Sequence, residues 1–355
     1  MSGQPPPRGD EASGWRRVKA GRRSYSSQKP QDLGGGVWSV PVPIPGNPLG
    51  YTLVYAIESP RGPVLVDAGW NHPDAWEALR GGFGVLGIDV AEVYGVVVTH
   101  FHPDHAGLAG QVREVSGAWI AMHEADAAIV TLMRGLADDE HRDFQAEMLR
   151  RAGAEGLDVS TTAAERPVPP AQPDRTLRDG ELVDLPGREL RAIHTPGHTP
   201  GHLCLRLDDR LFTGDHVLPG ITPHVGIYPY DRDDVDPLRD FLESLEKVAG
   251  YGHLSGLPAH EWIFPDVAAR AAEIRHHHEE RLHTLATLLT SIGEPLTIWE
   301  IAAMMTWNRA WDDLSPMLRG LAAGEAAAHL RTLEARGEIR RVSGVDPVRF
   351  QALDS

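Results

Sequence analysis

Three histidines and an aspartate lie within six positions of the stretch VVVTHFHPDHAGLAG, residues 96–110. They are His100, His102, Asp104 and His105, and they directly follow a run of β-branched residues that is typical of a buried strand. Imidazole is the commonest side-chain ligand for zinc and similar divalent ions, and carboxylate often accompanies it. Residues two apart in an extended segment point the same way, so His100 and His102 could bind one ion together. The spacing therefore predicts a metal site at the end of this strand.

Further candidate ligands follow at the ends of later predicted strands. The stretch AIHTPGHTPGHLCL contains His194, His198 and His202, LFTGDHVLPG places Asp215 after a glycine, and LSGLPAHEW contains His260. Separate strand ends that each carry a ligand residue are what a site at one rim of a sandwich requires. The histidines at 276–278 lie in the middle of a predicted helix, where consecutive residues face different directions. We expect them to form a solvated face, although one of the three could lean over the site.

Two batches of predicted strands, each followed by helices, indicate the fold class. The first batch of strands covers 37–46, 51–59, 62–70, 93–100 and 118–123, and the second covers 181–187, 189–197 and 202–215. The predicted helices cover 72–83, 105–117, a stretch ending near 152, and 236–248. This pattern predicts an α+β sandwich, with two sheets packed face to face and helices outside.

We expect three parts along the chain: a tail over 1–33, a catalytic domain over 34–265, and a helical domain over 266–355. The tail holds seven Lys/Arg against three Asp/Glu and no apolar run, which predicts a disordered leader rather than a secretory signal. In the last part, a long helix ends at Gly293, Thr297 and Glu300 form a capping box, and a helix closed by Gly337 precedes two short strands. This order is that of a winged-helix unit, although plain dimerisation domains share it.

In combination, these motifs resemble those of the metallo-β-lactamase-fold hydrolase superfamily over residues from about 37 to 265. The motifs are VLVDAG, THFHPDHAG, HTPGHTPGH, FTGDH and PAHE, in this order. The resemblance implies a four-layer αββα sandwich. The C-terminal unit is similar to the winged-helix appendage of some members, among them glyoxalase II-like hydrolases and endoribonuclease-type relatives. The stretch ITPHVGIYP adds to the likeness to that branch.

Carried over residue by residue, the resemblance implies two divalent cations, with zinc expected and iron or manganese as alternatives. The ligands of the first ion would be His100, His102 and His198, those of the second Asp104, His105 and His260, with Asp215 as the bridging carboxylate. Asp104 and Asp215 are thus the candidate catalytic carboxylates, and Asp104 could orient the nucleophile or take its proton. Asp67 matches an aspartate behind the ligands, with a simple turn residue as an equal alternative. His224, Tyr228 and Tyr230 are candidates for the substrate pocket.

The function that the resemblance favours is hydrolysis of a small thioester or ester by a water activated between two ions. An RNA or DNA phosphodiesterase is a second hypothesis, with the winged helix as its platform. Residues 266–355 hold ten Lys/Arg and thirteen Asp/Glu, and only about 45 residues separate Asp215 from His260, too few for the inserted domain of larger nuclease relatives. A mononuclear iron sulfur dioxygenase is a third hypothesis. A transcription regulator with a degenerate enzyme domain is a fourth, and the complete ligand set argues against it.

Composition narrows the class of protein further. The chain has 355 residues and a formal net charge of −16, so most of its surface would repel nucleic-acid phosphates. No run of 18 apolar residues is present, so we expect no membrane span. The single cysteine, Cys204, excludes an intramolecular disulfide and a cysteine-rich metal site. We therefore expect a cytoplasmic enzyme with a small-molecule substrate, whose C-terminal domain could mediate a homodimer.

Overall fold

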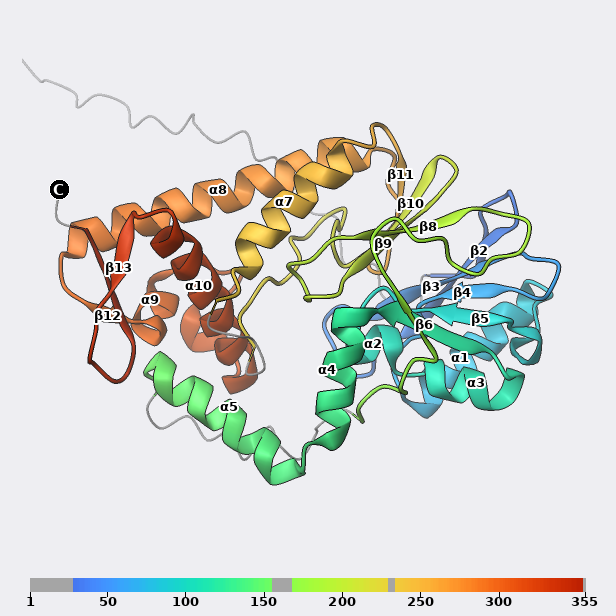
Figure 1. Ribbon diagram of the computed structural model, residues 1–355, viewed down its shortest axis with the longest axis horizontal. Coiled ribbons are helices and arrows are strands. Elements are labelled where there is room, and N and C mark those ends of the chain that lie inside the picture. The colour runs from blue at the N-terminus through green and yellow to red at the C-terminus, as the bar shows by residue number, and fades with distance from the viewer. Residues whose placement is uncertain (1–27, 155–167, 229–233, 354–355) are drawn as a thin grey trace, which may run out of the picture.

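The computed structural model describes residues 28–154, 168–228 and 234–353, and it contains two facing sheets (Figure 1). Within these residues the larger sheet has seven strands in the order β1-β2-β3-β4-β5-β6-β7. Neighbours from β1 to β4 are antiparallel, and those from β4 to β7 are parallel. The strands are Gln31–Asp32 (β1), Val37–Pro43 (β2), Tyr51–Ile57 (β3), Val64–Val66 (β4), Gly95–Val97 (β5), Trp119–His123 (β6) and Arg175–Leu177 (β7).

The smaller sheet has four strands in the order β11-β10-β9-β8. They are Leu190–His194 (β8), Leu203–Leu207 (β9), Arg210–Gly214 (β10) and Ser255–Pro258 (β11). The strand predicted over 181–187 is wrong: the backbone there makes only an isolated bridge between Leu182 and Arg191. Pro186 and Gly187 turn the chain back toward β8 before a longer ladder can form.

Helices cover the outer faces of both sheets, and apolar side chains fill each of the three interfaces. Val40, Leu79 and Val96 belong to a cluster between the larger sheet and its helices. Tyr55 and Phe212 lie in the cluster between the sheets, and their rings meet edge to face at 5.2 Å. The helices of the larger sheet are Pro73–Val85 (α1), Val90–Glu92 (η2), Pro103–Ala106 (α2) and Ala109–Ser116 (α3), and Pro237–Ala249 (α7) covers the smaller sheet. The predicted αββα sandwich is confirmed.

Two separate helices, α2 and α3, replace the single helix predicted over 105–117. The helix is interrupted just after the candidate ligands. Gly107 lies at the break, and a Cβ there would come within 2.3 Å of the Pro103 carbonyl oxygen and 2.6 Å of the Asn71 nitrogen. Only glycine allows the backbone to pack this closely against the segment after β4. The break lets α2 point its short first turn at the site while α3 follows the sheet.

A further pair of helices extends from the sandwich to the C-terminal part of the chain. Glu124–Gly135 (α4) begins at the sheet, and Asp138–Ala152 (α5) lies beside the C-terminal helices (Figure 1). The contact is direct, because the Val348 N–H donates to the Arg151 carbonyl at 2.9 Å. The region between residues 124 and 152 is therefore a bridge between the two ends of the molecule.

The described C-terminal part contains three α-helices, a short 3-10 helix and a small three-stranded sheet in the order β12-β14-β13. Its elements are Val267–Ile292 (α8), Leu296–Thr297 (β12), Ile298–Met304 (α9), Trp311–Asp313 (η3), Pro316–Ala335 (α10), Ile339–Arg341 (β13) and Arg349–Ala352 (β14). The stop of α8 at Gly293 and the capping box of Thr297 and Glu300 are confirmed. One apolar cluster runs from β9 and α7 into α8 and α10, across the predicted boundary at 265/266. That boundary and the winged-helix likeness remain predictions.

Two other predictions concern the N-terminal tail and membrane-spanning helices. The disordered leader falls almost wholly on residues 1–27, which lie outside the described residues. In the described part of the chain, no helix is both long and apolar enough to cross a membrane.

The expectation of a solvated histidine face on α8 is wrong for one of the three residues. His276 is exposed, but His278 is 1% exposed and packs against the ring of Phe241 on α7 and the ring of His329 on α10. Burial lowers the pKa of His278 to about 3 and that of His329 to about 4. In the unfolded chain these imidazoles gain a proton at an ordinary histidine pH. In the folded protein both stay neutral well below that pH.

We expect this burial to make the protein acid-sensitive. Because the folded pKa values lie below the unfolded value of ~6.5, the unfolded state takes up more protons as the pH falls from about 6.5 toward 4, and stability declines. The slope should be at most about 1.4 kcal/mol per pH unit for each histidine. Urea unfolding of His278→Gln at several pH values should show a slope lower by about that amount. An unchanged slope would contradict this assignment, and His276→Gln, at the exposed position two residues earlier, is the control.

Candidate metal centre

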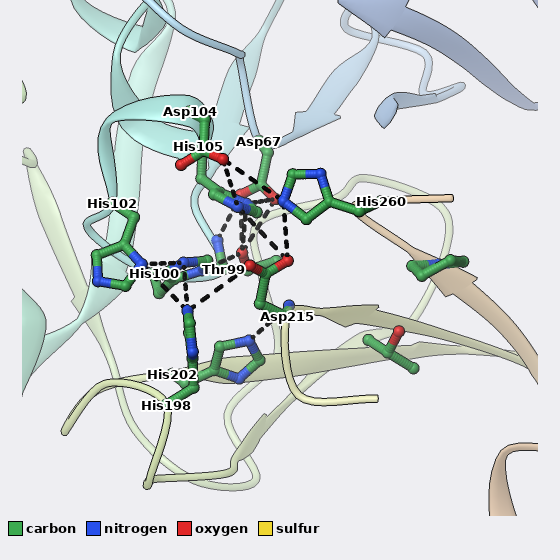
Figure 2. A network of polar contacts seen from close by, with 12 residues as sticks. Asp67, Thr99, His100, His102, Asp104, His105, His198, His202, Asp215 and His260 are labelled. Atoms are coloured by element: carbon green, nitrogen blue, oxygen red, sulfur yellow. Dashed lines mark hydrogen bonds and ion pairs between the residues drawn. The ribbon is translucent and has the colours of Figure 1, made fainter. Parts of the chain in front are cut away.

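The predicted ligands lie together at one rim of the sandwich, where the ends of four strands meet (Figure 2). His100 follows β5, His198 lies in the turn between β8 and β9, Asp215 follows β10 and His260 follows β11. The short helix α2 adds Asp104 and His105, and His102 precedes it. Their side chains form three overlapping groups that could hold a metal ion, with the ligand atoms of each group within 4.8 Å of one another. The predicted convergence is therefore present, although it was read from segments up to 160 residues apart.

Three imidazoles form the first group. His100 Nε2 lies 3.0 Å from His102 Nδ1, and His198 Nε2 lies 3.2 and 3.1 Å from these two atoms. Burial is the main cause that lowers the pKa of all three histidines, so they are neutral near pH 7. Neutral imidazoles are the form that binds metal. Nitrogens ~2.0–2.1 Å from one zinc ion stand only slightly farther apart than these.

Hydrogen bonds outside the group direct the lone pairs of these rings inward. His198 Nδ1 donates to the His224 carbonyl at 2.7 Å, which leaves Nε2 as the lone-pair nitrogen. His100 Nδ1 lies 3.1 Å from Thr99 Oγ1, whose own hydroxyl faces both carboxylate oxygens of Asp67 at 3.0 Å. This contact fixes the same tautomer for His100. Outer hydrogen bonds of this kind orient metal-binding histidines and increase their basicity.

The second group combines two imidazoles with two carboxylates. His260 Nε2 lies 3.4 Å from Asp104 Oδ2 and 3.3 Å from Asp215 Oδ1, and His105 Nε2 lies 3.6 Å from the same Asp215 oxygen. The other oxygen of Asp215 faces His198 Nε2 in the first group at 3.7 Å. Asp215 therefore lies between the groups and offers one oxygen to each (Figure 2).

Three inward-facing atoms of the second group are buried without a hydrogen-bond partner among the described residues: His105 Nε2, Asp215 Oδ1 and His260 Nε2. Orphaned buried polar atoms are costly, at roughly 1–3 kcal/mol each, and need an explanation. His260 Nδ1 donates to the Tyr51 carbonyl at 2.9 Å, so in the neutral ring Nε2 carries the lone pair. A lone pair and a carboxylate oxygen aimed at one point fit a cation between them.

Charge in the second group leads to the same conclusion. Burial by itself lowers the pKa of His260, but the charges of Asp215 and Asp104 outweigh it and raise that pKa to about 10. The same two carboxylates, with Asp67, hold the pKa of His105 well above its usual value against the effect of burial. The carboxylates thus require positive charge beside them, which is supplied either by protons on both histidines or by a divalent cation. The donor set fits a divalent metal that accepts nitrogen and oxygen ligands.

Asp67 is hydrogen-bonded to the candidate ligand His105 and to Thr99, and it lies behind the candidate site. Its Oδ2 accepts from His105 Nδ1 at 2.8 Å, and its Oδ1 accepts from the Thr99 N–H at 2.7 Å. The side chain is 2% exposed, and its backbone has a φ of 62°, a left-handed conformation that is strained for a residue with a Cβ. The surrounding hydrogen bonds hold this conformation, which turns His105 Nε2 toward the site.

Asp126, near the start of α4, is a residue that the sequence prediction missed. It is fully buried and accepts from three donors on two loops: the Phe101 N–H at 3.0 Å, the Thr199 hydroxyl at 2.9 Å and the Gly201 N–H at 2.6 Å. Phe101 lies between His100 and His102, and Thr199 directly follows His198. Asp126 therefore joins the two loops of the first histidine group. In the sequence it is only an acidic residue in the first turn of a helix, which gives no sign of burial.

The predicted pocket residues have different outcomes. His224 lies beside the site, and its Nδ1 is 3.4 Å from Glu325 Oε2 of α10, which also pairs with Arg281 at 3.2 Å. The ring of Tyr228 meets those of His102 and His224 at centroid distances of 6.1 and 5.9 Å. Tyr230 lies outside the described residues. Contact with a substrate remains a prediction for all three.

Comparison with known proteins agrees with this geometry. Residues 47–253 match the family model described as the metallo-beta-lactamase superfamily. The chain belongs to this superfamily. A metallo-beta-lactamase family protein of Thermus thermophilus has a TM-score of 0.76 and 30% identity, with 91% of this chain and all of that chain covered. A beta-lactamase domain protein of Burkholderia ambifaria has a TM-score of 0.74 and 27% identity, with 91% and 93% covered. Both alignments extend well beyond residues 47–253, so these superfamily members share most of the C-terminal part as well.

Two curated relatives of this superfamily member come from fungi. The chain is 24% identical over 258 residues to the lactamase-like protein nscB of Aspergillus fumigatus, covering 70% of this chain and 61% of that protein. It is 25% identical over 259 residues to the atrochrysone carboxyl ACP thioesterase of Aspergillus chevalieri, covering 70% and 64%. The chain thus spans less than two thirds of the length of these relatives.

Proposed function

We propose that the protein is a metal-dependent hydrolase that cleaves a small thioester or ester with two divalent cations, zinc being the expected metal. One observation carries this proposal: two groups of neutral or carboxylate-paired histidines meet at Asp215, and three of their inward-facing atoms are buried without a partner among the described residues. The ligands of the first cation would be His100, His102 and His198. Those of the second would be Asp104, His105 and His260, with Asp215 bridging.

The residues of the site suit hydrolysis. Bound divalent cations would polarise the scissile carbonyl and make a water acidic enough to lose a proton near neutral pH. The Asp104 carboxylate is available to orient the attacking water, because His105 and His260 lower the pKa of Asp104 to about 2 against the effect of burial. Asp67 and the Tyr51 carbonyl hold His105 and His260 in place through their Nδ1 atoms. This preorganisation reduces the reorganisation needed during the reaction.

A thioester is the favoured substrate class because one of the similar proteins is named as an acyl carrier protein thioesterase. The phosphodiesterase hypothesis lacks such support, since residues 266–355 carry more acidic than basic side chains. We keep a cytoplasmic location and a homodimer through the C-terminal domain as proposals.

The test is hydrolysis of a simple thioester, S-octanoyl-N-acetylcysteamine, by zinc-loaded protein. We expect turnover by the wild type and a loss of at least ~1,000-fold in kcat/KM for His102→Ala, because a contribution of several kcal/mol is removed. His253→Ala is the matched control, since His253 is 85% exposed and away from the site. Metal analysis should give two zinc ions per chain. One iron per chain would favour the dioxygenase, RNA cleavage would favour the phosphodiesterase, and no cleavage of thioester or ester by fully loaded protein would refute the proposal.

A further inference from the structure

A cavity of about 290 Å³ lies between α5, α10 and β14, and none of the candidate metal ligands lines it. Phe144 and Met148 of α5, Ala323 and Ala327 of α10 and Phe350 of β14 form much of its wall. The volume is near the lower limit of ~300 Å³ for small-molecule pockets. The space is partly open to solvent, since Phe144 of its wall is exposed, and its volume suits a short acyl chain.

Tyr228 connects this cavity to the candidate metal centre. It lines the cavity, and its ring also makes the edge contact with His102 described above. The neighbouring Ile227 lines the cavity too, and its N–H donates to the Gly324 carbonyl of α10 at 3.1 Å. The segment before residue 229 is therefore held between α10 and the histidines. Tyr228 therefore lies between the cavity and the first histidine group.

The side chains of the cavity wall are mostly apolar, and several carry a positive charge. Three arginines line the cavity, Arg151, Arg331 and Arg341, against one carboxylate, Glu147. The local excess of basic side chains contrasts with the net charge of −16 for the whole chain. Glu147 is paired with Arg150 at 2.8 Å. Arg341 pairs with Glu334 at 3.1 Å through one terminal nitrogen, while its Nε is buried without a hydrogen-bond partner within the described residues.

We propose that this cavity binds the acyl part of the substrate, and that the acyl group is apolar along its length and anionic at its far end. This inference rests on the proposed thioesterase function and names its substrate class. The apolar side chains accept the hydrocarbon part, and Arg341 faces the terminal carboxylate. The thiol part lies on the other side of the scissile bond and stays outside this cavity.

Cavity filling tests the apolar part. Ala327→Phe places a ring into the cavity from a half-buried position, and Ala335→Phe adds the same ring at an exposed position on the same helix. The substrates are S-acetyl- and S-octanoyl-N-acetylcysteamine. We expect Ala327→Phe to lower kcat/KM for the octanoyl substrate at least ~10-fold and to leave the acetyl substrate within about twofold, while Ala335→Phe changes neither. Equal losses for both acyl lengths would overturn the proposal.

Charge removal tests the anionic end. The substrates are S-octanoyl-N-acetylcysteamine and the mono-thioester of octanedioic acid, which differ by a terminal carboxylate. We expect the wild type to prefer the carboxylate substrate and Arg341→Gln to lower that preference about 10-fold, mainly through KM. Glu334→Gln removes the ion pair but keeps the arginine, so it should retain the preference. A preference unchanged in Arg341→Gln would overturn this part.

A binding measurement tests the cavity site independently of the proposed hydrolysis. Calorimetry with zinc-loaded protein measures binding of octanoate, which needs no turnover. If no thioester is cleaved but Ala327→Phe weakens octanoate binding at least ~10-fold and Ala335→Phe does not, the cavity site stands and the proposed function fails. If octanoate binding is equal in wild type and Ala327→Phe, the ligand binds elsewhere, such as at the metal centre, and the cavity site is refuted.

Discussion

Replacing Asp215 with alanine is expected to abolish activity almost completely, with kcat/KM lowered by at least ~1,000-fold. Asp215 is the one carboxylate among the described residues that faces both histidine groups, with one oxygen near His198 and the other near His105 and His260. These last two histidines hold the pKa of the Asp215 carboxyl well below its usual range although burial raises it, so it is ionised near pH 7. Its loss removes negative charge from the point where two cations would meet.

Asp215→Asn sharpens this prediction because it keeps the shape and removes the charge. We expect it to lose nearly as much activity as Asp215→Ala and to hold fewer than two metal ions per chain by elemental analysis. Asp74→Ala, at a position 78% exposed, is the control and should behave as the wild type. Full activity in Asp215→Ala would rule out the two-cation site.

Replacing Asp126 with alanine is expected to give the second large effect, on metal affinity and on stability together. The change leaves the Phe101 and Gly201 N–H groups and the Thr199 hydroxyl without their acceptor. Each buried orphan costs roughly 1–3 kcal/mol, so we expect about 3 kcal/mol or more from the free energy of unfolding. Because both loops of the first histidine group lose their common anchor, zinc affinity should fall ~10–100-fold.

A chelator competition measures zinc affinity well below the melting temperature, where a loss of stability alone would leave it unchanged. Asp126→Asn keeps one acceptor oxygen and should lie between alanine and wild type. Glu124→Ala is a matched control in the same helical turn, because Glu124 makes a surface ion pair with Arg178 and should cost less than ~1 kcal/mol. Wild-type zinc affinity in Asp126→Ala would show that the aspartate does not position the ligands.

Much of the site was predictable because its signals are local. His100, His102, Asp104 and His105 lie within six residues, and the later candidates lie at the end of a short apolar run or in a Gly/Pro turn. Asp126 gave no such signal, because its three partners are 25, 73 and 75 residues away in the chain. His278 was expected in solvent for the same reason: helix periodicity gives the direction of a side chain but does not say which neighbour covers it.

The sequence by itself determined the candidate ligand set, most of the order of the strands and helices, and the superfamily, since these depend on residue types and short spacings. Only the tertiary structure decided that Asp126 joins two ligand loops, that α2 and α3 separate at Gly107, and that α5 and α10 enclose a cavity beside Tyr228. The physical reason is that strand and helix patterns act over a few residues. Burial and enclosure arise from contacts between segments that meet only after folding.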